Sequence, residues 1–147
     1  MNENVKTLNT LITSIFYDLT DIEKRIFAQG KFNDVSINEI RTIQAIGVEN
    51  LKKMSEVAMA LKITVGTLTI SINRLVKKGY VRRVKIEEDR RIVMLGLTEK
   101  GKLVYQTHEK FHCEIIENIV STLNENEQKM LIQSLENVCD FFKSKYY

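Results

Sequence analysis

The sequence predicts a mainly α-helical protein with one small β-hairpin, and three observations lead to this fold class. The 147 residues include no proline and only six glycines, which favours long helices and few irregular loops. Apolar residues recur at every third or fourth position over most of the chain, as they do in amphipathic helices. Over residues 80–97 the period changes to two, which is typical of paired strands.

The composition is that of a single globular domain. A chain of 147 residues forms one ordinary core and is hardly long enough for two independent domains. No apolar run reaches the roughly 18 residues of a membrane span, and the N-terminus lacks the basic start and apolar core of a signal peptide. The two cysteines, Cys113 and Cys139, are too few for a disulfide framework and suit a reducing cytoplasm. We therefore expect a cytoplasmic protein without a membrane partner.

The first predicted helix runs from about Val5 to Gln29 and ends at Gly30. Its apolar residues follow one another in alternating steps of three and four, which is a heptad pattern: Val5, Leu8, Ile12, Ile15, Leu19, Ile22 and Ile26. A terminal helix with so broad an apolar face has to pack against a large surface. Packing within the chain and packing in a dimer both satisfy this requirement, and the matching apolar stripe of the last helix favours a dimer.

Three shorter helices are predicted in the middle of the chain, at about 36–46, 55–61 and 65–78. Ser36 and Glu39 form a capping-box pair at the start of the first of them. Thr64 is a suitable N-cap for the third. Gly47 and Gly79 end the first and the third, since glycine adopts the left-handed conformation that terminates a helix.

A hairpin and two helices complete the predicted order, with approximate bounds 80–86, 92–97, 99–122 and 124–144. The turn of the hairpin, residues 87–91, is fully charged. Thr98 caps the next helix, and Asn124 with Glu127 forms a second capping box at the start of the last. The last helix carries an apolar stripe formed by Leu131, Leu135, Val138 and Phe142.

Two short helices followed by a basic hairpin make up a winged helix-turn-helix. Eight basic and three acidic residues lie between Arg74 and Arg91, so this stretch carries a charge of +5 while the rest of the chain carries −2. A local excess of this kind marks a face that binds a polyanion. Scattered surface charge accounts for the same numbers, but the order of the elements favours DNA binding.

Candidate DNA contacts lie on the helix over 65–78 and at the hairpin tip. The helix is small and polar on its outer side, which suits the major groove, and Gly66 lets its N-terminus approach a phosphate. The arginines of the hairpin tip suit a narrow minor groove. The candidates are Thr64, Gly66, Thr67, Thr69, Ser71, Asn73, Arg74, Lys77, Arg90 and Arg91. Each of them alone is compatible with an ordinary solvated surface.

Four segments together resemble the MarR family of bacterial regulators: 64–69, 75–83, 89–91 and 97–101. The resemblance implies a single domain over 1–147, with a DNA-binding region at 36–98 and a helical dimerisation region formed by 1–30 and 99–147. It implies a homodimer that binds a pseudo-palindromic double-stranded operator, with Arg91 as the wing arginine. Lys53 departs from the pattern, because the family often has a threonine or serine cap there, and this weakens the boundary expected near Ser55.

Further segments, at 14–16, 32–43 and 110–112, are similar to the FabT branch of that family. This similarity implies a repressor of fatty-acid-synthesis genes whose corepressor is long-chain acyl-acyl carrier protein. An acyl chain would then lie in an apolar channel walled by Ile12, Ile15, Phe16, Leu19, Phe111, Ile115 and Ile119, although ordinary core packing accounts for the same residues. Arg25, Arg41 and Lys110 are candidates for docking the acidic carrier. The alternatives are release from DNA by a small aromatic effector or by oxidation.

We identify no motif of an enzyme active site, a metal site or a cofactor site in the sequence. His108 and His112 have a spacing that suits a metal, but no further ligand pattern accompanies them, and we expect a surface pair or a buried histidine with a hydrogen-bond partner. Cys139 is expected to be packed and inert beside Val138 and Phe141. A dimeric interaction module without DNA binding is the rival from a different class, and it leaves the basic hairpin unexplained.

Overall fold

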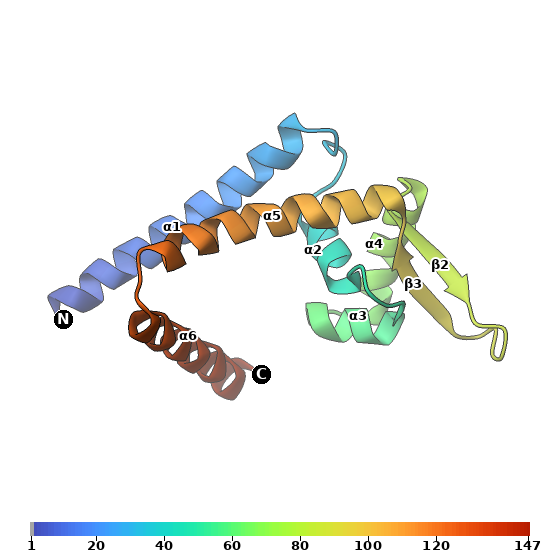
Figure 1. Cartoon of the computed structure of the whole chain (residues 1–147). Coiled ribbons are helices and arrows are strands. Elements are labelled where there is room, and N and C mark those ends of the chain that lie inside the picture. The colour runs from blue at the N-terminus through green and yellow to red at the C-terminus, as the bar shows by residue number, and fades with distance from the viewer. Residues whose placement is uncertain (1) are drawn as a thin grey trace. The chain divides into compact units, whose positions relative to one another are not determined.

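A computed structural model describes residues 2–147 of the chain, and within that range it has six helices and three strands (Figure 1). The elements are α1 (Glu3–Gln29), α2 (Ile37–Ile46), β1 (Lys52–Lys53), α3 (Met54–Leu61), α4 (Val65–Lys77), β2 (Val81–Lys85), β3 (Val93–Leu97), α5 (Glu99–Ser121) and α6 (Glu125–Tyr146). The predicted fold class, mainly α with a hairpin wing, is confirmed.

The chain divides into two compact units. The first ends at His108 and the second covers Glu109–Tyr147, so that α5 contributes to both. The first unit contains the helix-turn-helix and the wing, and the second contains the end of α5 and α6. The expected assignment of DNA binding to 36–98 and of dimerisation to the terminal helices concerns function, and it stays a prediction.

The sheet has three strands in the order β1-β3-β2, all antiparallel. The predicted hairpin pairs Val81 with Leu97 and Lys85 with Val93. The strand β1, in which Lys52 pairs with Leu95, was not predicted. It has only two residues, and a two-residue strand is too short to produce an alternating pattern in the sequence.

The core of the first unit lies between α2, α3, α4 and the inner face of the sheet. The three helices, strand β3 and the start of α5 contribute side chains that are wholly buried: Ile40, Ile43, Ile46, Val57, Leu68, Ile72, Leu75, Leu95 and Val104. Tyr80, between α4 and β2, is also fully buried. Burial of an aliphatic side chain of this size stabilises the fold by about 1.5–3 kcal/mol. This core fixes α4 relative to the wing.

The predicted caps are present, and one boundary differs. Ser36 and Glu39 exchange both hydrogen bonds of a capping box, and Thr98 Oγ1 accepts from the N–H of Gly101 at 3.1 Å. The helix expected from Ser55 begins at Met54. Lys53 stands at its N-cap, and the carboxylate of Glu56 accepts from the Lys53 N–H at 2.6 Å. A lysine side chain has no acceptor, so only this half of a capping box forms.

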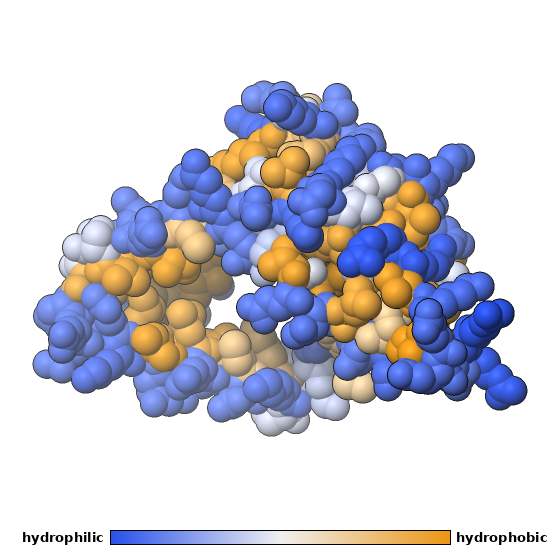
Figure 2. Space-filling view, turned by 45° about the vertical axis from the view of Figure 1, so that its right-hand side comes forward, coloured by the Kyte–Doolittle hydropathy of each residue, from blue (hydrophilic) through white to orange (hydrophobic). Residues whose placement is uncertain are grey.

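The terminal helices leave much of their apolar surface uncovered within the chain. α1 buries only Glu23 and Phe27, and α6 has no buried residue. Figure 2 shows hydrophobic side chains at the surface of the protein outside the winged helix-turn-helix. The cysteine prediction is wrong for the single chain, because Cys139 is exposed, as is Cys113. The reason is that the apolar stripe of α6 has no neighbour within its own unit to cover it.

No single helix among residues 2–147 combines the length and hydropathy of a membrane span. Helices α3 and α4 reach the length and hydropathy of a membrane span only when they are counted together, and the chain bends by 106° between them.

Gly101 lets the first turn of α5 cross closely over the backbone that follows α4. A Cβ atom at this position would overlap the carbonyl oxygen of Tyr80 and would lie 3.3 Å from the Cβ of Leu97. Both contacts involve atoms that cannot rotate away. The close approach positions Val104 in the core and fixes α5 to the end of the wing.

We expect Gly101→Ala to lower the free energy of unfolding by roughly 1–3 kcal/mol, because the methyl group forces α5 off the Tyr80 carbonyl. Gly66→Ala is the matched control, since its Cβ would meet nothing closer than 3.9 Å, and it should raise helix stability by up to about 1 kcal/mol. Urea unfolding followed by circular dichroism, at one protein concentration, measures both. Equal stability of the two variants would contradict the packing argument.

Candidate nucleic-acid interface

A three-residue turn sets α3 and α4 at the angle of a helix-turn-helix. Lys62 adopts the left-handed conformation at φ 56° and ends α3. Thr64 begins α4, and its Oγ1 accepts from the N–H of Thr67 at 3.1 Å. The resulting bend of 106° lies within the 90–120° of helix-turn-helix motifs.

The two sides of α4 differ sharply in burial. Leu68, Ile72 and Leu75 face the core and are fully buried. The opposite side is exposed and carries Gly66, Thr67, Ile70, Asn73, Arg74 and Lys77. Val65, which the sequence pattern assigns to the apolar side, is 48% exposed because it occupies the first turn, beyond the edge of the core.

Several of the predicted contact residues are already engaged within the protein. Thr69 donates its hydroxyl to the Val65 carbonyl at 2.8 Å, and Thr67 Oγ1 accepts from the Thr64 hydroxyl at 2.9 Å. Ser71 is half-buried, with its hydroxyl 3.3 Å from that of Thr42 on α2. These bonds reduce the hydrogen-bonding capacity that α4 presents to a ligand.

Asn73 connects α4 to the wing. Its amide oxygen accepts from Nη2 of Arg83, on β2, at 2.5 Å. Arg83 was not among the predicted site residues, because strand pairing between distant segments decides which wing residue comes to face α4. The bond means that Asn73 orients the wing in addition to lying on the exposed side of α4.

The wing ends in a turn that presents two arginines. Asp89 organises it: its carboxylate accepts from the N–H of Arg91 at 3.0 Å, and its carbonyl accepts from the N–H of Ile92 at 3.0 Å. Arg90 and Arg91 are exposed. Asp89 therefore holds the turn together, and both arginine side chains project from this turn into solvent.

A groove of about 440 Å³ runs between α2 and α4. Arg41 and Arg74 lie on opposite helices and contribute cationic groups, while Ile63 and Ile70 contribute apolar surface. The full lining is Ser36, Asn38, Glu39, Arg41, Thr42, Leu61, Ile63, Thr67, Ile70, Ser71 and Arg74. The groove therefore joins the predicted contact residues of α4 to the exposed surface of α2.

An ion pair beneath this surface holds the end of α4 against α2. Nζ of Lys78 lies 2.8 Å and 3.0 Å from the two carboxylate oxygens of Glu39, which is 5% exposed, and it also donates to the Asp34 carbonyl. Glu39 at the same time caps α2. Lys78 is thus a structural cation, which the sequence pattern does not separate from the exposed Lys77.

Tyr80 closes the same network from the wing. Its hydroxyl donates to Asp34 Oδ1 at 2.5 Å. Burial raises the pKa of Tyr80 well above its ordinary value, and the hydrogen bond to Asp34 adds to that effect. The same bond lowers the pKa of Asp34. At neutral pH Tyr80 is therefore protonated and Asp34 is ionised, and these are the states in which the hydroxyl donates to the carboxylate.

The residues of the expected acyl channel fall in different parts of the structure. Ile12, Ile15, Phe16 and Leu19 lie on α1 in the first unit. Phe111, Ile115 and Ile119 lie on α5 in the second unit, where they line a shallow groove of about 310 Å³ with Glu114 and Asn118. The channel itself stays a prediction.

His108 has a partner on α1. Its Nε2 lies 2.6 Å from Oε1 of Glu23, and both side chains are largely buried. This fits the expectation of a buried histidine with a hydrogen-bond partner. Among the docking candidates, Arg25 is paired with Asp21 at 2.8 Å, and Lys110 lies 3.9 Å from Glu114.

The bent helix pair, the exposed side of α4 and the ordered basic wing define a winged helix-turn-helix protein of the DNA-binding class. A model of the MarR family matches residues 35–93. FabT of Streptococcus pneumoniae, in a crystal structure of its complex with DNA, matches with a TM-score of 0.86 and 37% identity over 95% of this chain and 98% of FabT. SarZ of Staphylococcus saprophyticus, an HTH-type transcriptional regulator, is 32% identical over 103 residues, which are 69% of this chain and 70% of SarZ.

A mutant of Escherichia coli MarR complexed with operator DNA shares the fold, with a TM-score of 0.64 and 21% identity over 92% of this chain and 95% of its own. The chain belongs to the MarR family. It is a DNA-binding transcriptional regulator and not an enzyme.

Proposed function

We propose that this regulator binds a pseudo-palindromic operator as a homodimer, with α4 in the major groove and the wing in the minor groove. The observation that carries the proposal is the exposed side of α4 lying beside a wing whose tip presents Arg90 and Arg91. The groove between α2 and α4 adds Arg41 to the positive surface. Phosphate contacts supply most of the affinity, and contacts to base edges supply the specificity.

The uncovered terminal helices support the dimer. On α1 an apolar stripe remains exposed over successive turns, with Leu8, Ile12 and Ile15 each more than half exposed. On α6 most of the predicted stripe is exposed as well: Leu135, at 57%, Val138 and Phe142 are exposed, and Leu131 is half-buried. Exposed apolar stripes of this extent mark a surface that another protein chain covers. A second copy presents the same helices and satisfies this requirement by two-fold symmetry.

Selection from a library of random duplexes tests the proposal. We expect the full chain to enrich a pseudo-palindrome whose half-site centres lie about one helical turn, ~10 bp, apart, and to sediment as a dimer. The logarithm of its affinity should fall linearly with the logarithm of salt concentration, since bound phosphates release counterions. A monomer with no preference for any duplex would contradict both parts of the proposal.

The contact residues should separate into two kinds. Arg91→Ala should weaken binding to most sequences, above all those with A·T-rich flanks, because the wing contact depends on the minor groove. Thr67→Ala or Arg74→Ala should instead relax the preference at one base pair in each half-site, by about 1–3 kcal/mol. Lys129→Ala, on exposed α6, removes the same charge elsewhere and serves as the control. Anisotropy titrations against single-base operator variants measure these effects, and unchanged binding by Arg91→Ala would refute the wing assignment.

We further propose that the regulated genes are those of fatty-acid synthesis, with repression strengthened by long-chain acyl-acyl carrier protein. The support is the resemblance to the FabT branch, together with 37% identity to S. pneumoniae FabT along nearly the whole chain. The groove on α5 formed by Phe111, Ile115 and Ile119 offers part of an apolar wall for an acyl chain. Among residues 2–147, Arg41 is the docking candidate that forms no ion pair, whereas Arg25 and Lys110 each lie near an acidic side chain.

Operator affinity should rise when long-chain acyl carrier is present and should not change with unacylated carrier. Longer chains should have larger effects, since each buried methylene contributes about 0.8 kcal/mol. Ile119→Gln should remove the effect, whereas Ile116→Gln, which is exposed on α5 outside the groove, should retain it. Coupling is reciprocal, so operator DNA should tighten acyl-carrier binding by the same factor.

If acyl carrier leaves operator affinity unchanged or lowers it, the proposal of a lipid corepressor is refuted. The protein is still a DNA-binding regulator in that case. Release of DNA by a small aromatic acid, or by oxidation of the exposed Cys113 or Cys139, would then point to the alternative effectors.

A further inference from the structure

An isoleucine occupies the middle of the exposed side of α4. Ile70 follows Thr67 by three positions and precedes Arg74 by four, so the three side chains lie on one helical stripe. It is 58% exposed, and it lies opposite the buried Leu68 and Ile72. A single exposed aliphatic residue needs no explanation by itself, so its surroundings decide whether it has a role.

The neighbouring polar groups of α4 are largely committed elsewhere. Thr69 donates to its own helix, Ser71 faces α2, and the amide oxygen of Asn73 is held by Arg83. What this stripe presents to a ligand is therefore Thr67, Ile70 and Arg74, in that order along the helix. The middle of the stripe is apolar, and its two ends are polar.

Ile70 also continues an apolar surface instead of standing alone. Ile63, in the turn before α4, is 37% exposed and lines the same groove as Ile70, together with the half-buried Leu61. Thr67 lines the same groove. The apolar strip begins at the turn and reaches the centre of the exposed side of α4.

We propose that Ile70 is a specificity residue that selects thymine in each half-site by packing against the thymine 5-methyl group. The inference rests on the proposed binding of α4 in the major groove. In that groove thymine alone among the four bases presents a methyl group, and apolar side chains contact it. A cytosine at this position would instead place its amino group against Ile70, where it would lose water without gaining an acceptor.

Deoxyuridine provides the sharpest probe, because it differs from thymidine only by the absent methyl group and keeps every hydrogen-bonding atom. The probes are the duplex obtained by selection and a series of copies in which each symmetric pair of thymines is replaced by deoxyuridine. We expect one pair to weaken binding by about fourfold per half-site, the factor for one buried methyl-sized group, and by about fifteenfold for both half-sites together.

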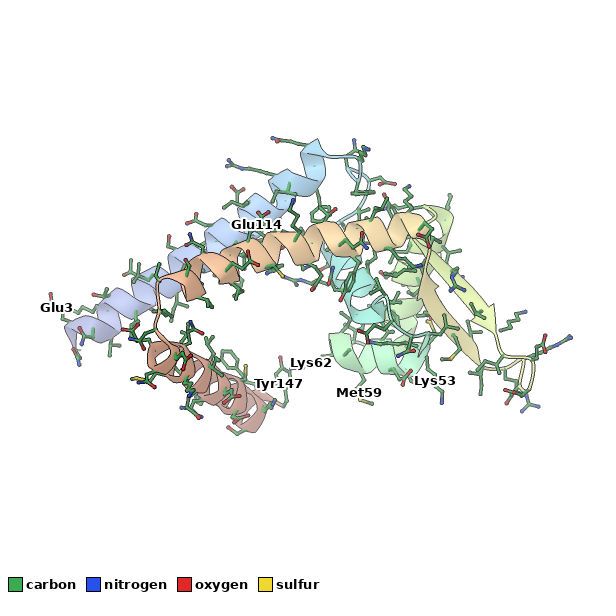
Figure 3. The ribbon with its side chains drawn as sticks, viewed as in Figure 1. Glu3, Lys53, Met59, Lys62, Glu114 and Tyr147 are labelled. Atoms are coloured by element: carbon green, nitrogen blue, oxygen red, sulfur yellow. The ribbon has the colours of Figure 1, made fainter. Side chains whose placement is uncertain are left out.

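Ile70→Ala should bind the thymine duplex more weakly than the wild type and should lose this discrimination, so that its affinities for the thymine and deoxyuridine duplexes agree within about twofold. Met59→Ala is the matched control. Met59 is 78% exposed on α3, does not line the groove, and projects away from the helix in Figure 3. This variant should keep the wild-type sensitivity at the same thymine. The salt dependence of all three proteins should be equal, since no phosphate contact changes.

The outcomes distinguish this inference from the proposed function. Failure to select any duplex overturns both. A selected operator that tolerates deoxyuridine at every position overturns the role of Ile70 and leaves operator binding intact, and this measurement needs only the wild-type protein. Sensitivity that survives in Ile70→Ala also overturns it, and would assign the methyl contact to another residue such as Thr67.

Discussion

The burial of one side of α4 is the constraint on which the rest of the first unit depends. Leu68, Ile72 and Leu75 are fully buried, and α4 packs against α2, α3 and β2. Their position fixes the rotation of α4 about its axis, and this rotation decides that Thr67, Ile70 and Arg74 point outward. The interior thus determines which residues of α4 are available to DNA, without any of the buried side chains touching it.

Polar contacts at the two ends of α4 supplement this apolar constraint. At the N-terminus, the Thr64 cap sets where the helix begins. At the C-terminus, Lys78 joins α4 to the buried carboxylate of Glu39, which also caps α2. A buried ion pair contributes little to net stability, but losing one partner leaves an uncompensated charge. The pair therefore joins the end of α4 to α2, and it adds little to the net stability of the fold.

Most of the fold was predictable because the determining signals are local. Caps at Ser36, Thr64 and Asn124 and the change of period after Gly79 mark elements within a few residues. β1 and the roles of Arg83 and Lys78 were not predictable, since they arise from contacts between distant segments. The exposure of Ile70 has a different cause: an apolar residue gives no polar signal, but the helical period counted from Leu68 places Ile70 opposite the core. The sequence of one chain does not say whether a second chain covers the exposed apolar residues of α1 and α6.

The close approach at Gly101 has a consequence for how a signal travels through the molecule. Thr98 donates to the carbonyl of Gly79, Lys100 donates to that of Lys78, and Gly101 lies directly against Tyr80. Three successive carbonyls at the end of α4 are therefore covered by the first turn of α5, with no flexible linker between them. A tilt of α5 at this end has to carry α4 and the wing with it as one rigid body. In the proposed homodimer, turning α5 at this end would change the distance between the two α4 helices on a duplex, without any contact between an effector and the DNA-facing surface.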